Sequence, residues 1–423
     1  MINRIVFFTN GDARNANVWS NVPYCFSYAL ENKGITVHRV DYSMPTSFVK
    51  FYNLVLRRFF DSLTFRKIRF PYLSKTWLFK FFAERKIRKA IQQYQRADLF
   101  LFMGYGFYNK WNNTPSLLFS DWTTEMDIHK KRTPNFLEQR IIQQEKEAIT
   151  HAEYVISLFP ICCEEMKKRY PKANIHFLGG NVINDLSGLR LKETHPNPPC
   201  LGREDQTIDE QDHLQICSSS KDIYVDTLLE TKAKSKKLLF IGRKTTYLEA
   251  AKKLVEAYKL LKQEEDYKDF TLDIVGCAES DFDSLPEGVT CYGFLNKSEE
   301  KDRKIYYDLL LNAKILVNAN PKWGAFSSTV EAMYYYTPVI VSPYQDFVKI
   351  FGDKMDFGIY NQIFTAESIA NDIKAIINSD NYTEMCNFAH ENVKSYTWDN
   401  YTDKLLKLIK DITSESQNLN NAI

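Results

Sequence analysis

Short apolar runs alternate with longer amphipathic segments along almost the whole chain. The short runs resemble strands buried on both faces of a parallel sheet, and the longer segments have the period of helices. The predicted strands are 4–9, 36–41, 98–103, 116–119, 154–158 and 175–178, then 237–241, 271–275, 289–292, 315–317 and 338–341. Helices are predicted between them, for example over 134–150, 161–170, 248–263, 300–312 and 366–378. This alternation predicts an α/β fold with a parallel sheet in each half.

The pattern fails between the two halves. From about 184 to 236 the sequence is polar and non-periodic, with Pro-Asn-Pro-Pro, an acidic run and Cys-Ser-Ser-Ser. Such a stretch is typical of a linker, an insertion or a mobile loop. We therefore predict an N-terminal domain at 1–184, a linker or insertion at 185–236, a C-terminal domain at 237–395, and a C-terminal helix with a tail at 396–423.

Composition narrows the class of protein. The chain has 423 residues, 44% hydrophobic and 26% charged, with a net charge of +2, so no overall field draws it to nucleic acid or membrane. Its 8 cysteines have no metal-ligand spacing, which favours reduced thiols in a cytoplasm. The first apolar run is too short for a signal peptide, and no apolar stretch is long enough to span a bilayer. We expect a cytoplasmic protein, at most peripheral to a membrane.

The segment from Pro321 to Val341 has the features of a nucleotide-diphosphate site. A loop of small residues enters a predicted helix through three hydroxyl residues, and one carboxylate follows a turn later; these are Ser327, Ser328, Thr329 and Glu331. A diphosphate can accept from the free N–H groups at such a helix start, where the dipole is positive. A buried glutamate just beyond can hold a ribose diol. An ordinary strand–loop–helix–strand unit with a Ser/Thr cap fits the same residues.

Other predicted strands also end in residues suited to a ligand. Arg243 follows Gly242 at the end of one strand, and the forked guanidinium favours a role in binding phosphate. A surface loop with two exposed cations is the alternative interpretation of the same residues. Gly276 and Gly293 end the next two strands and would let a flat ring approach the backbone. Because parallel strands gather ligands beyond their carboxyl ends, the sequence predicts one crevice lined for a nucleotide.

These segments occur in a recognisable order. The second half contains LLFIGR at 238–243, LVEAYKLL at 254–261, LDIVG at 272–276 and VTCYGFL at 289–295, followed by 321–341. In this order it resembles family 4 of the retaining glycosyltransferases, of the bacterial polysaccharide or glycolipid type. The resemblance implies the GT-B fold: two Rossmann-like domains facing a central cleft, with the C-terminal helix packing back on the N-terminal domain. It also implies sugar transfer from a nucleotide-diphosphate donor to an acceptor hydroxyl, with retention and with neither a metal nor a cofactor.

The resemblance assigns roles in the donor site. Glu331 matches the second glutamate of the E-x7-E motif, the ribose ligand, and Arg243 matches the catalytic arginine that neutralises the β-phosphate. The remaining donor positions face the diphosphate or the base: Gly324, Ser327, Ser328, Thr329, Gly293 and Phe294.

Two positions depart from the family pattern. Trp323 stands where the first glutamate, a contact of the donor hexose, is expected, so that role is lost, replaced by stacking on a sugar face, or taken over elsewhere. Lys244 is a possible substitute for the lysine that usually follows the arginine. These departures keep two alternatives open: a degenerate GT-B protein acting as a binding or scaffold partner, and a phosphorylase-like or epimerase-like GT-B enzyme.

The first half supplies candidates for the acceptor side. Trp19 and Asn181 lie near strand ends, where the resemblance places contacts with a saccharide or lipid-linked acceptor. Asp121 follows an apolar strand and could orient an acceptor hydroxyl or accept its proton, as a second catalytic residue. A helix or turn cap is an equally open role for Asp121.

A basic and aromatic segment stands apart from these motifs. Residues 48–89 hold twelve Lys/Arg, two acidic residues, Asp61 and Glu84, and many aromatic residues. This mixture suits the face of an anionic membrane. The alternative is a helical excursion that packs its aromatic side chains on the domain core. No nucleic-acid recognition motif is present, so we expect no nucleic-acid partner.

Overall fold

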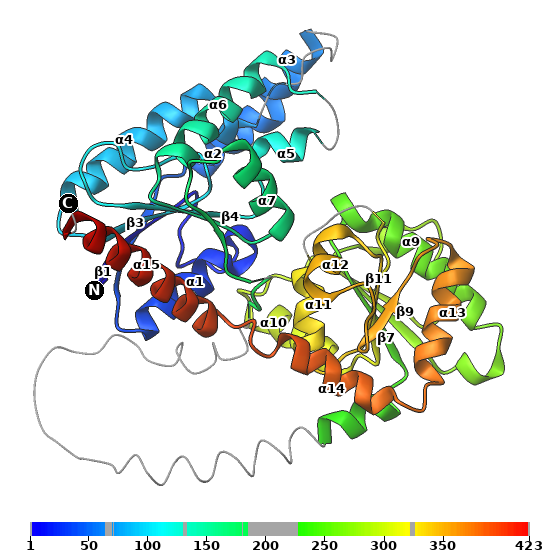
Figure 1. Ribbon diagram of the computed structural model, residues 1–423. Helices are drawn as coiled ribbons and strands as arrows, with labels where there is room; N and C mark the ends of the chain where they lie inside the picture. The colour runs from blue at the N-terminus through cyan, green and yellow to red at the C-terminus, as the bar shows by residue number, and fades with distance from the viewer. Residues whose placement is uncertain are drawn as a thin grey trace, which may run out of the picture. The chain divides into compact units, whose positions relative to one another are not determined.

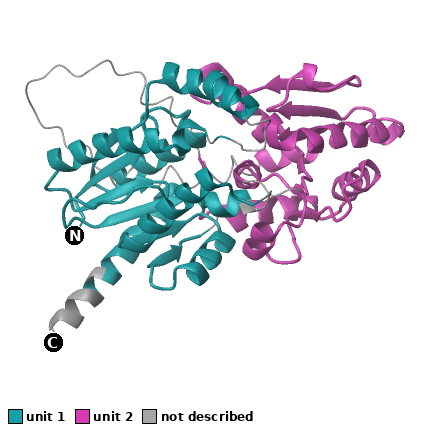
Figure 2. Cartoon of the chain, turned by 90° about the horizontal axis from the view of Figure 1, so that it is seen from above, with its two compact units in different colours: residues 1–182, 396–423 teal, residues 183–395 magenta. Residues whose placement is uncertain are grey.

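The chain forms two compact units. The computed structural model describes residues 2–63, 70, 72–129, 133–179, 181–184, 227–321 and 326–421. One unit comprises residues 1–182 with 396–423 and the other residues 183–395 (Figure 2). We call them unit 1 and unit 2. The described part of the chain has no helix long and apolar enough to cross a membrane.

Unit 1 is built on a six-stranded parallel sheet with the strand order β2-β1-β3-β4-β5-β6. Its strands are β1 (Arg4–Thr9), β2 (Thr36–Asp41), β3 (Leu99–Met103), β4 (Ser116–Ser120), β5 (Tyr154–Ser157) and β6 (Ile175–Phe177). Strands β3, β4 and β5 are buried along their whole length, which explains their continuous apolar sequences. All six predicted strands of the first half are therefore confirmed.

Helices cover both faces of this sheet (Figure 1). They are η1 (Val18–Asn21), α1 (Val22–Asn32), α2 (Thr46–Phe51), η2 (Tyr52–Leu56), α3 (Arg57–Leu63), η3 (Leu73–Lys75), α4 (Trp77–Gln93), α5 (Thr124–His129), α6 (Phe136–His151) and α7 (Pro160–Arg169). A capping box starts α6, because Asn135 accepts from the backbone of Glu138, whose side chain accepts from the backbone of Asn135.

The C-terminal helix α15 (Trp398–Asn421) packs on unit 1 beside α1 (Figure 1). Trp398 stacks on Phe26 of α1 at 4.9 Å between ring centroids. Tyr401 meets Phe119 of β4 edge-on at 5.9 Å. The predicted return of the C-terminal helix to the N-terminal half is thus confirmed.

Unit 2 is built on a second six-stranded parallel sheet, with the order β12-β11-β10-β7-β8-β9. Its strands are β7 (Lys237–Ile241), β8 (Thr271–Val275), β9 (Val289–Gly293), β10 (Ile315–Asn318), β11 (Val339–Val341) and β12 (Gly358–Tyr360). The first five were predicted. The sequence analysis missed β12, a half-buried edge strand of 3 residues, because so short a run has no apolar signal of its own.

Helices again flank the sheet on both faces (Figure 1). They are α9 (Lys244–Leu261), η5 (Glu265–Tyr267), η6 (Glu279–Asp281), α10 (Glu300–Asn312), α11 (Ser327–Tyr334), α12 (Gln345–Phe351), α13 (Ala366–Ile377) and α14 (Tyr382–Val393). Helices α9 and α13 pack together, as do α11 and α14. A further helical stretch at 227–234, inside the predicted linker, joins this unit through Lys232, whose buried amine donates to the carbonyls of Leu310 and Ala313 at the end of α10.

Candidate functional site

The strand order of unit 2 creates a switch point between β7 and β10. Strands β8 and β9 extend from one side of β7, and β10, β11 and β12 extend from the other. In open α/β sheets ligands bind beyond the carboxyl ends of the strands at such a point. Here the two strand ends are joined directly, because Asn318 Nδ2 donates to the carbonyl of Ile241 at 3.1 Å.

Two helices start at this point. Arg243 occupies the N-cap position of α9, directly after β7. Ser327, Ser328 and Thr329 form the first turn of α11, which follows β10. Neither helix start has a side-chain cap hydrogen bond. Both helices therefore turn the positive end of their dipole, uncapped by a side chain, toward the carboxyl edge of neighbouring strands, an arrangement suited to an anion.

Backbone hydrogen bonds connect three glycine turns beside these helix starts. The N–H of Gly242 donates to Val275 at 3.0 Å, the N–H of Lys244 to Gly276 at 3.0 Å, and the N–H of Gly276 to Gly293 at 2.7 Å. Gly276 has φ +95°, and a Cβ there would overlap the carbonyl of Gly242. Close packing between turns therefore requires glycine at this position.

The next glycine has a different setting. Gly293 has φ +62°, and nothing lies within 4 Å of the place where a Cβ would stand. Its neighbour Phe294 is 71% exposed. This turn therefore has open space and an exposed ring at the position predicted for base contacts.

Glu331 is buried, with 3% of its surface exposed. Lys297 Nζ lies 3.4 Å from Oε1, and the Tyr306 hydroxyl donates to Oε2. Lys297 also lies over the Tyr306 ring, 4.5 Å from its centroid. Burial, and then the charge of Glu331, raises the pKa of Tyr306 well above its ordinary value. Both oxygens of the predicted ribose ligand are thus engaged by partners that the sequence analysis missed.

Lys244 is the first residue of α9, and its amine pairs with Asp281 of η6. The hydrogen bond from Lys244 lowers the pKa of the Asp281 carboxyl. The structure therefore brings the Lys244 amine to the turn after β8. Trp323 and Gly324, the other predicted donor residues in this region, lie outside the described residues.

The carboxyl edge of unit 1 has its own switch point, between β1 and β3. Trp19, Ser20 and Asn21 follow β1 and all have positive φ, at 40°, 54° and 74°. Residues other than glycine rarely adopt this conformation, and a run of three stores backbone strain. The Trp19 ring meets Phe119 of β4 edge-on at 6.2 Å.

Asp121 lies at the same edge, directly after β4. Its Oδ1 accepts from the backbone N–H of Trp122 at 2.7 Å and from the Ser120 hydroxyl at 3.3 Å. Its backbone carbonyl accepts from the Ser157 hydroxyl at 3.3 Å. Burial raises the pKa of the Asp121 carboxyl. The side chain therefore braces its own turn, while Oδ2 accepts no hydrogen bond from the described part of the chain.

Asn181 follows β6 and is buried. Its Nδ2 has no hydrogen-bond acceptor among the described residues. An unsatisfied buried amide is costly in a folded protein and commonly marks a position that a ligand or a water completes. Across the described ranges, no three His, Cys, Asp or Glu side chains are grouped so as to hold a metal ion.

Comparison with known proteins adds a family and a fold. Residues 235–379 match the family model described as Glycosyl transferases group 1. No curated protein sequence gives a significant match. Among solved structures, the chain is similar to a glycosyltransferase from Rickettsia africae, at 15% identity and a TM-score of 0.58, over 97% of this chain and 99% of that one.

Two further structures are similar over nearly their whole length. One is WaaG, a glycosyltransferase involved in lipopolysaccharide biosynthesis, at 12% identity and a TM-score of 0.57, over 95% of this chain and 98% of that one. The other is HepE from Anabaena, solved with UDP and glucose, at 13% identity and a TM-score of 0.51, over 98% of this chain and 100% of that one. The chain has the GT-B fold, as predicted. The family match, which includes both helix starts of unit 2, supports sugar transfer.

Proposed function

We propose that this chain transfers a sugar from a nucleotide-diphosphate donor to an acceptor hydroxyl, with the donor held by unit 2. The observation behind the proposal is the pair of helix starts at the switch point between β7 and β10. One presents Arg243 and the other presents Ser327 to Thr329, within the stretch that matches the glycosyltransferase model. The UDP and glucose bound to HepE support a nucleotide-sugar donor of this kind.

In this proposal the positive groups act on the leaving diphosphate. Charge develops on its β-phosphate as the glycosyl bond breaks, and fixed donors aimed there lower the barrier most. Arg243 offers a forked cation, and the first turn of α11 offers backbone N–H groups and hydroxyls. These groups supply the electrostatic role without a metal. We propose retention of anomeric configuration, in the manner of family 4, because of the ordered motifs around Arg243 and Glu331.

The Glu331 cluster defines what donor binding requires. A ribose diol that donates to this carboxylate would replace the Tyr306 hydroxyl on Oε2. Lys297 would remain paired with Oε1. Donor binding therefore exchanges one hydrogen bond for another and leaves the ion pair in place.

Acceptor contacts are proposed on unit 1. Asp121 has an oxygen available at the carboxyl edge and a raised pKa, both of which suit a group that orients or deprotonates a hydroxyl. Trp19 offers a ring for a sugar face, and Asn181 an amide donor with no acceptor among the described residues.

The test compares Arg243→Ala with Lys259→Ala, an exposed cation near the far end of the same helix. Release of nucleoside diphosphate from UDP- and GDP-sugars would be followed with and without saccharide acceptors, beside calorimetric titration of UDP. Loss of a group that stabilises the leaving oxyanion should lower turnover by about 10²–10³-fold, whereas Lys259→Ala should match wild type. Equal turnover in the two variants would contradict the role of Arg243. UDP binding without turnover of any donor would instead favour the scaffold alternative, which no observation in the structure supports.

We further propose that unit 1 rests on an anionic membrane surface through the described residues of the segment 48–89. Ten of the fourteen exposed large hydrophobic side chains in the described part of the chain lie between Phe51 and Phe82. The continuous helix formed by α2, η2 and α3 has no fully buried side chain, and its Phe51, Phe59 and Phe60 rings are exposed. Exposed apolar side chains beside cations are typical of an interfacial helix.

Charge favours an anionic surface over a protein partner. The described residues of this segment include nine cations, against Asp61 and Glu84: Lys50, Arg57, Arg58, Lys75, Lys80, Arg85, Lys86, Arg88 and Lys89. Each cation near such a surface contributes about 1 kcal/mol. A lipid-linked acceptor would meet the enzyme there.

A matched pair of phenylalanines tests this surface. Phe81 and Phe136 are both 56% exposed, but only Phe81 lies in the segment. Co-sedimentation with phosphatidylglycerol–phosphatidylcholine vesicles should fall for Phe81→Ala, and further for Trp77→Ala/Phe81→Ala, while Phe136→Ala sediments like wild type. Sedimentation that does not depend on phosphatidylglycerol, or that falls equally for Phe136→Ala, would contradict the proposal.

A further inference from the structure

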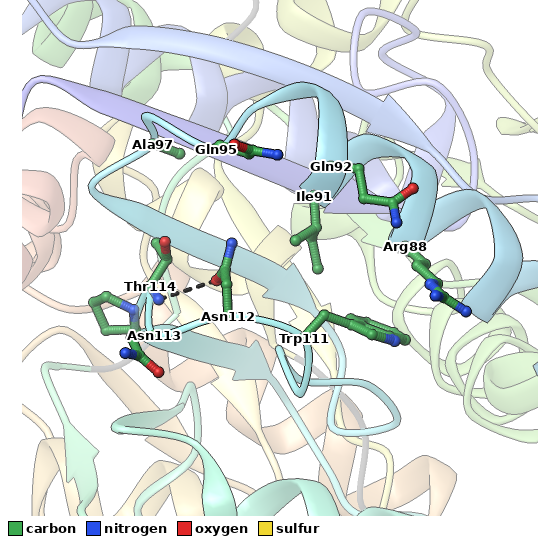
Figure 3. Close-up of a pocket in the computed structure, with 10 residues that line it drawn as sticks. Arg88, Ile91, Gln92, Gln95, Ala97, Trp111, Asn112, Asn113 and Thr114 are labelled. Atoms are coloured by element: carbon green, nitrogen blue, oxygen red, sulfur yellow. Dashed lines mark hydrogen bonds between the residues drawn. The ribbon is translucent and has the colours of Figure 1, made fainter.

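A cavity of about 570 Å³ lies on unit 1 (Figure 3). It is bounded by the last turns of α4 and by the loop before β4, from Trp111 to Pro115. These residues adjoin the amino ends of β3 and β4. Asp121 follows the carboxyl end of β4, so the two places are separated by the length of a strand of 5 residues, about 17 Å. The cavity is therefore distinct from the carboxyl edge.

The lining combines polar side chains with apolar ones. The guanidinium of Arg88 and the amides of Gln92, Gln95 and Asn113 border the cavity, together with the indole of Trp111. Figure 3 shows Trp111 on the loop below Ile91 of α4, with Arg88 beside it. The four polar side chains make no hydrogen bond with the described part of the chain. No acidic residue lines the cavity, so it offers donors in excess and no cation site.

The loop under the cavity is held in place by Asn109. Its Nδ2 donates to the carbonyls of Asn112 and Thr114, at 3.0 and 2.7 Å. Its Oδ1 accepts from the backbone N–H of Trp111 at 3.1 Å, and its own N–H donates to Ser116 of β4 at 2.8 Å. The turn that presents Trp111 is thus fixed before any ligand arrives, which reduces the entropy lost on binding.

The indole of Trp111 is also fixed. Lys110 pairs with Glu84 of α4 at 2.8 Å and lies over the Trp111 ring, 5.3 Å from its centroid. A smaller depression lined by Lys110 and Glu84 also borders Trp111. The Trp111 ring therefore borders both the cavity and the smaller depression, and Lys110 contacts it from the side of the depression.

We propose that this cavity is a second saccharide-binding site. An indole wall suits the apolar face of a pyranose ring, and amides and a guanidinium match the paired hydroxyls on its rim. The volume lies within the range of about 300–1,000 Å³ typical of small-ligand sites. A single cation is too little for a nucleic-acid backbone, and an acyl chain would leave the polar side chains of the lining without hydrogen-bond partners.

The proposed function gives this site a purpose. A glycan held at the cavity would stay attached to the enzyme between transfers, which raises the effective concentration of its reactive end. That purpose rests on the proposed function, whereas saccharide binding at the cavity does not.

The experiment uses the full chain on a printed glycan array, followed by titration of the strongest hit in solution. Trp111→Ala should weaken binding on the order of tenfold, as expected for loss of one aromatic contact with its packing. Phe136→Ala is the control, because it removes an aromatic ring that is 56% exposed and lies outside the cavity. Arg88→Ala, on the exposed side of α4, gives a second variant should Trp111→Ala misfold, and should also weaken binding.

Further arms separate this site from the transfer site. Arg243→Ala should bind the same glycans as wild type even where turnover is lost. Glycan binding at the cavity can therefore be judged even if the proposed function fails. The proposal is overturned if wild type binds no glycan on the array. It is equally overturned if well-folded Trp111→Ala and Arg88→Ala bind with wild-type affinity.

Discussion

The carboxyl edges of the two sheets differ in backbone strain and in how their polar groups are paired. At the edge of unit 2, each oxygen of Glu331 has a partner, Lys297 or Tyr306, and the glycine turns satisfy one another, although the buried Oδ1 of Asn318 has no donor among the described residues. At the edge of unit 1, the backbone from Trp19 to Asn21 is strained, and the buried Nδ2 of Asn181 has no acceptor among the described residues. Satisfied networks are rigid, whereas strained and unsatisfied groups are typical of surfaces that a ligand completes.

This difference indicates how the two units share the work. Under the proposed function, the edge of unit 2 holds the nucleotide diphosphate with groups that are already hydrogen-bonded in place. The edge of unit 1 retains features that a variable acceptor can satisfy. Substitutions at the first edge should therefore cost stability as well as function, and those at the second should cost function alone.

The largest effect is expected from Glu331→Ala. The substitution leaves the Lys297 amine, whose side chain is 17% exposed, without its counter-charge in a buried site. Breaking such a pair costs about 3–5 kcal/mol, so the thermal midpoint of unit 2 should fall together with UDP affinity. Glu331→Ala/Lys297→Met should recover stability but not UDP binding. If Glu331→Ala is as stable as wild type, the edge of unit 2 does not differ from that of unit 1 in its contribution to stability.

Asp121→Asn should affect chemistry and spare the fold. A proton acceptor typically contributes about 10²–10⁴-fold to turnover, so kcat should fall while donor KM stays constant. Burial raises the pKa of this carboxyl, so its ionised form is disfavoured by folding, and the amide should not lower the thermal midpoint at neutral pH. In wild type, activity should be lost as pH falls through this raised pKa. Asp127→Asn, an exposed change on α5, is the control, and a loss of stability in Asp121→Asn would favour the turn-bracing role alone.

Substitution of two glycines of unit 2 by alanine should separate the steric cost of an added Cβ from the conformational cost of a positive φ. Gly276→Ala adds an overlap with Gly242 to an unfavourable φ of +95°, for a cost of about 2–4 kcal/mol. Gly293→Ala has open space and a φ of +62°, so only about 1 kcal/mol is expected. Denaturant unfolding measures both. Equal losses would show that the turns are not closely packed.

The sequence predicted the strands well because buried parallel strands are continuous apolar runs, as in β3 and β4. It placed the start of α9 at 248, whereas the helix begins at Lys244. The first turn, Lys-Thr-Thr-Tyr, is polar on every side and has no apolar period. The sequence therefore predicts Arg243 only as a cation at a strand end, and the structure shows that it also stands at a helix start.

The partners of Glu331 could not be predicted in the same way. Lys297 is 34 residues from Glu331 along the chain, and no local pattern links a loop lysine to a helix glutamate. The general rule that a buried carboxylate requires a cation predicts that a partner exists but does not identify it. The strain at Trp19 also had no sequence signal, because residues other than glycine seldom adopt positive φ.

A dependence on pH, and not a fixed loss, is expected away from the strand ends, at Lys232. Its buried amine donates to Leu310, Ala313 and Thr337, and burial lowers its pKa to about 7. Above that pH the folded chain holds a neutral amine while the unfolded chain stays protonated up to its ordinary pKa, so stability should rise with pH between about 7 and 10, by on the order of 1 kcal/mol per pH unit. Below pH 7 both forms are protonated and this slope vanishes. Lys232→Met should lose the slope in denaturant unfolding measured across this range, whereas Lys259→Ala, exposed on α9, should keep it. If the slope persists in Lys232→Met, a group other than Lys232 titrates in this pH range. The surroundings of Lys232 then compensate its buried charge as fully as Lys297 compensates that of Glu331.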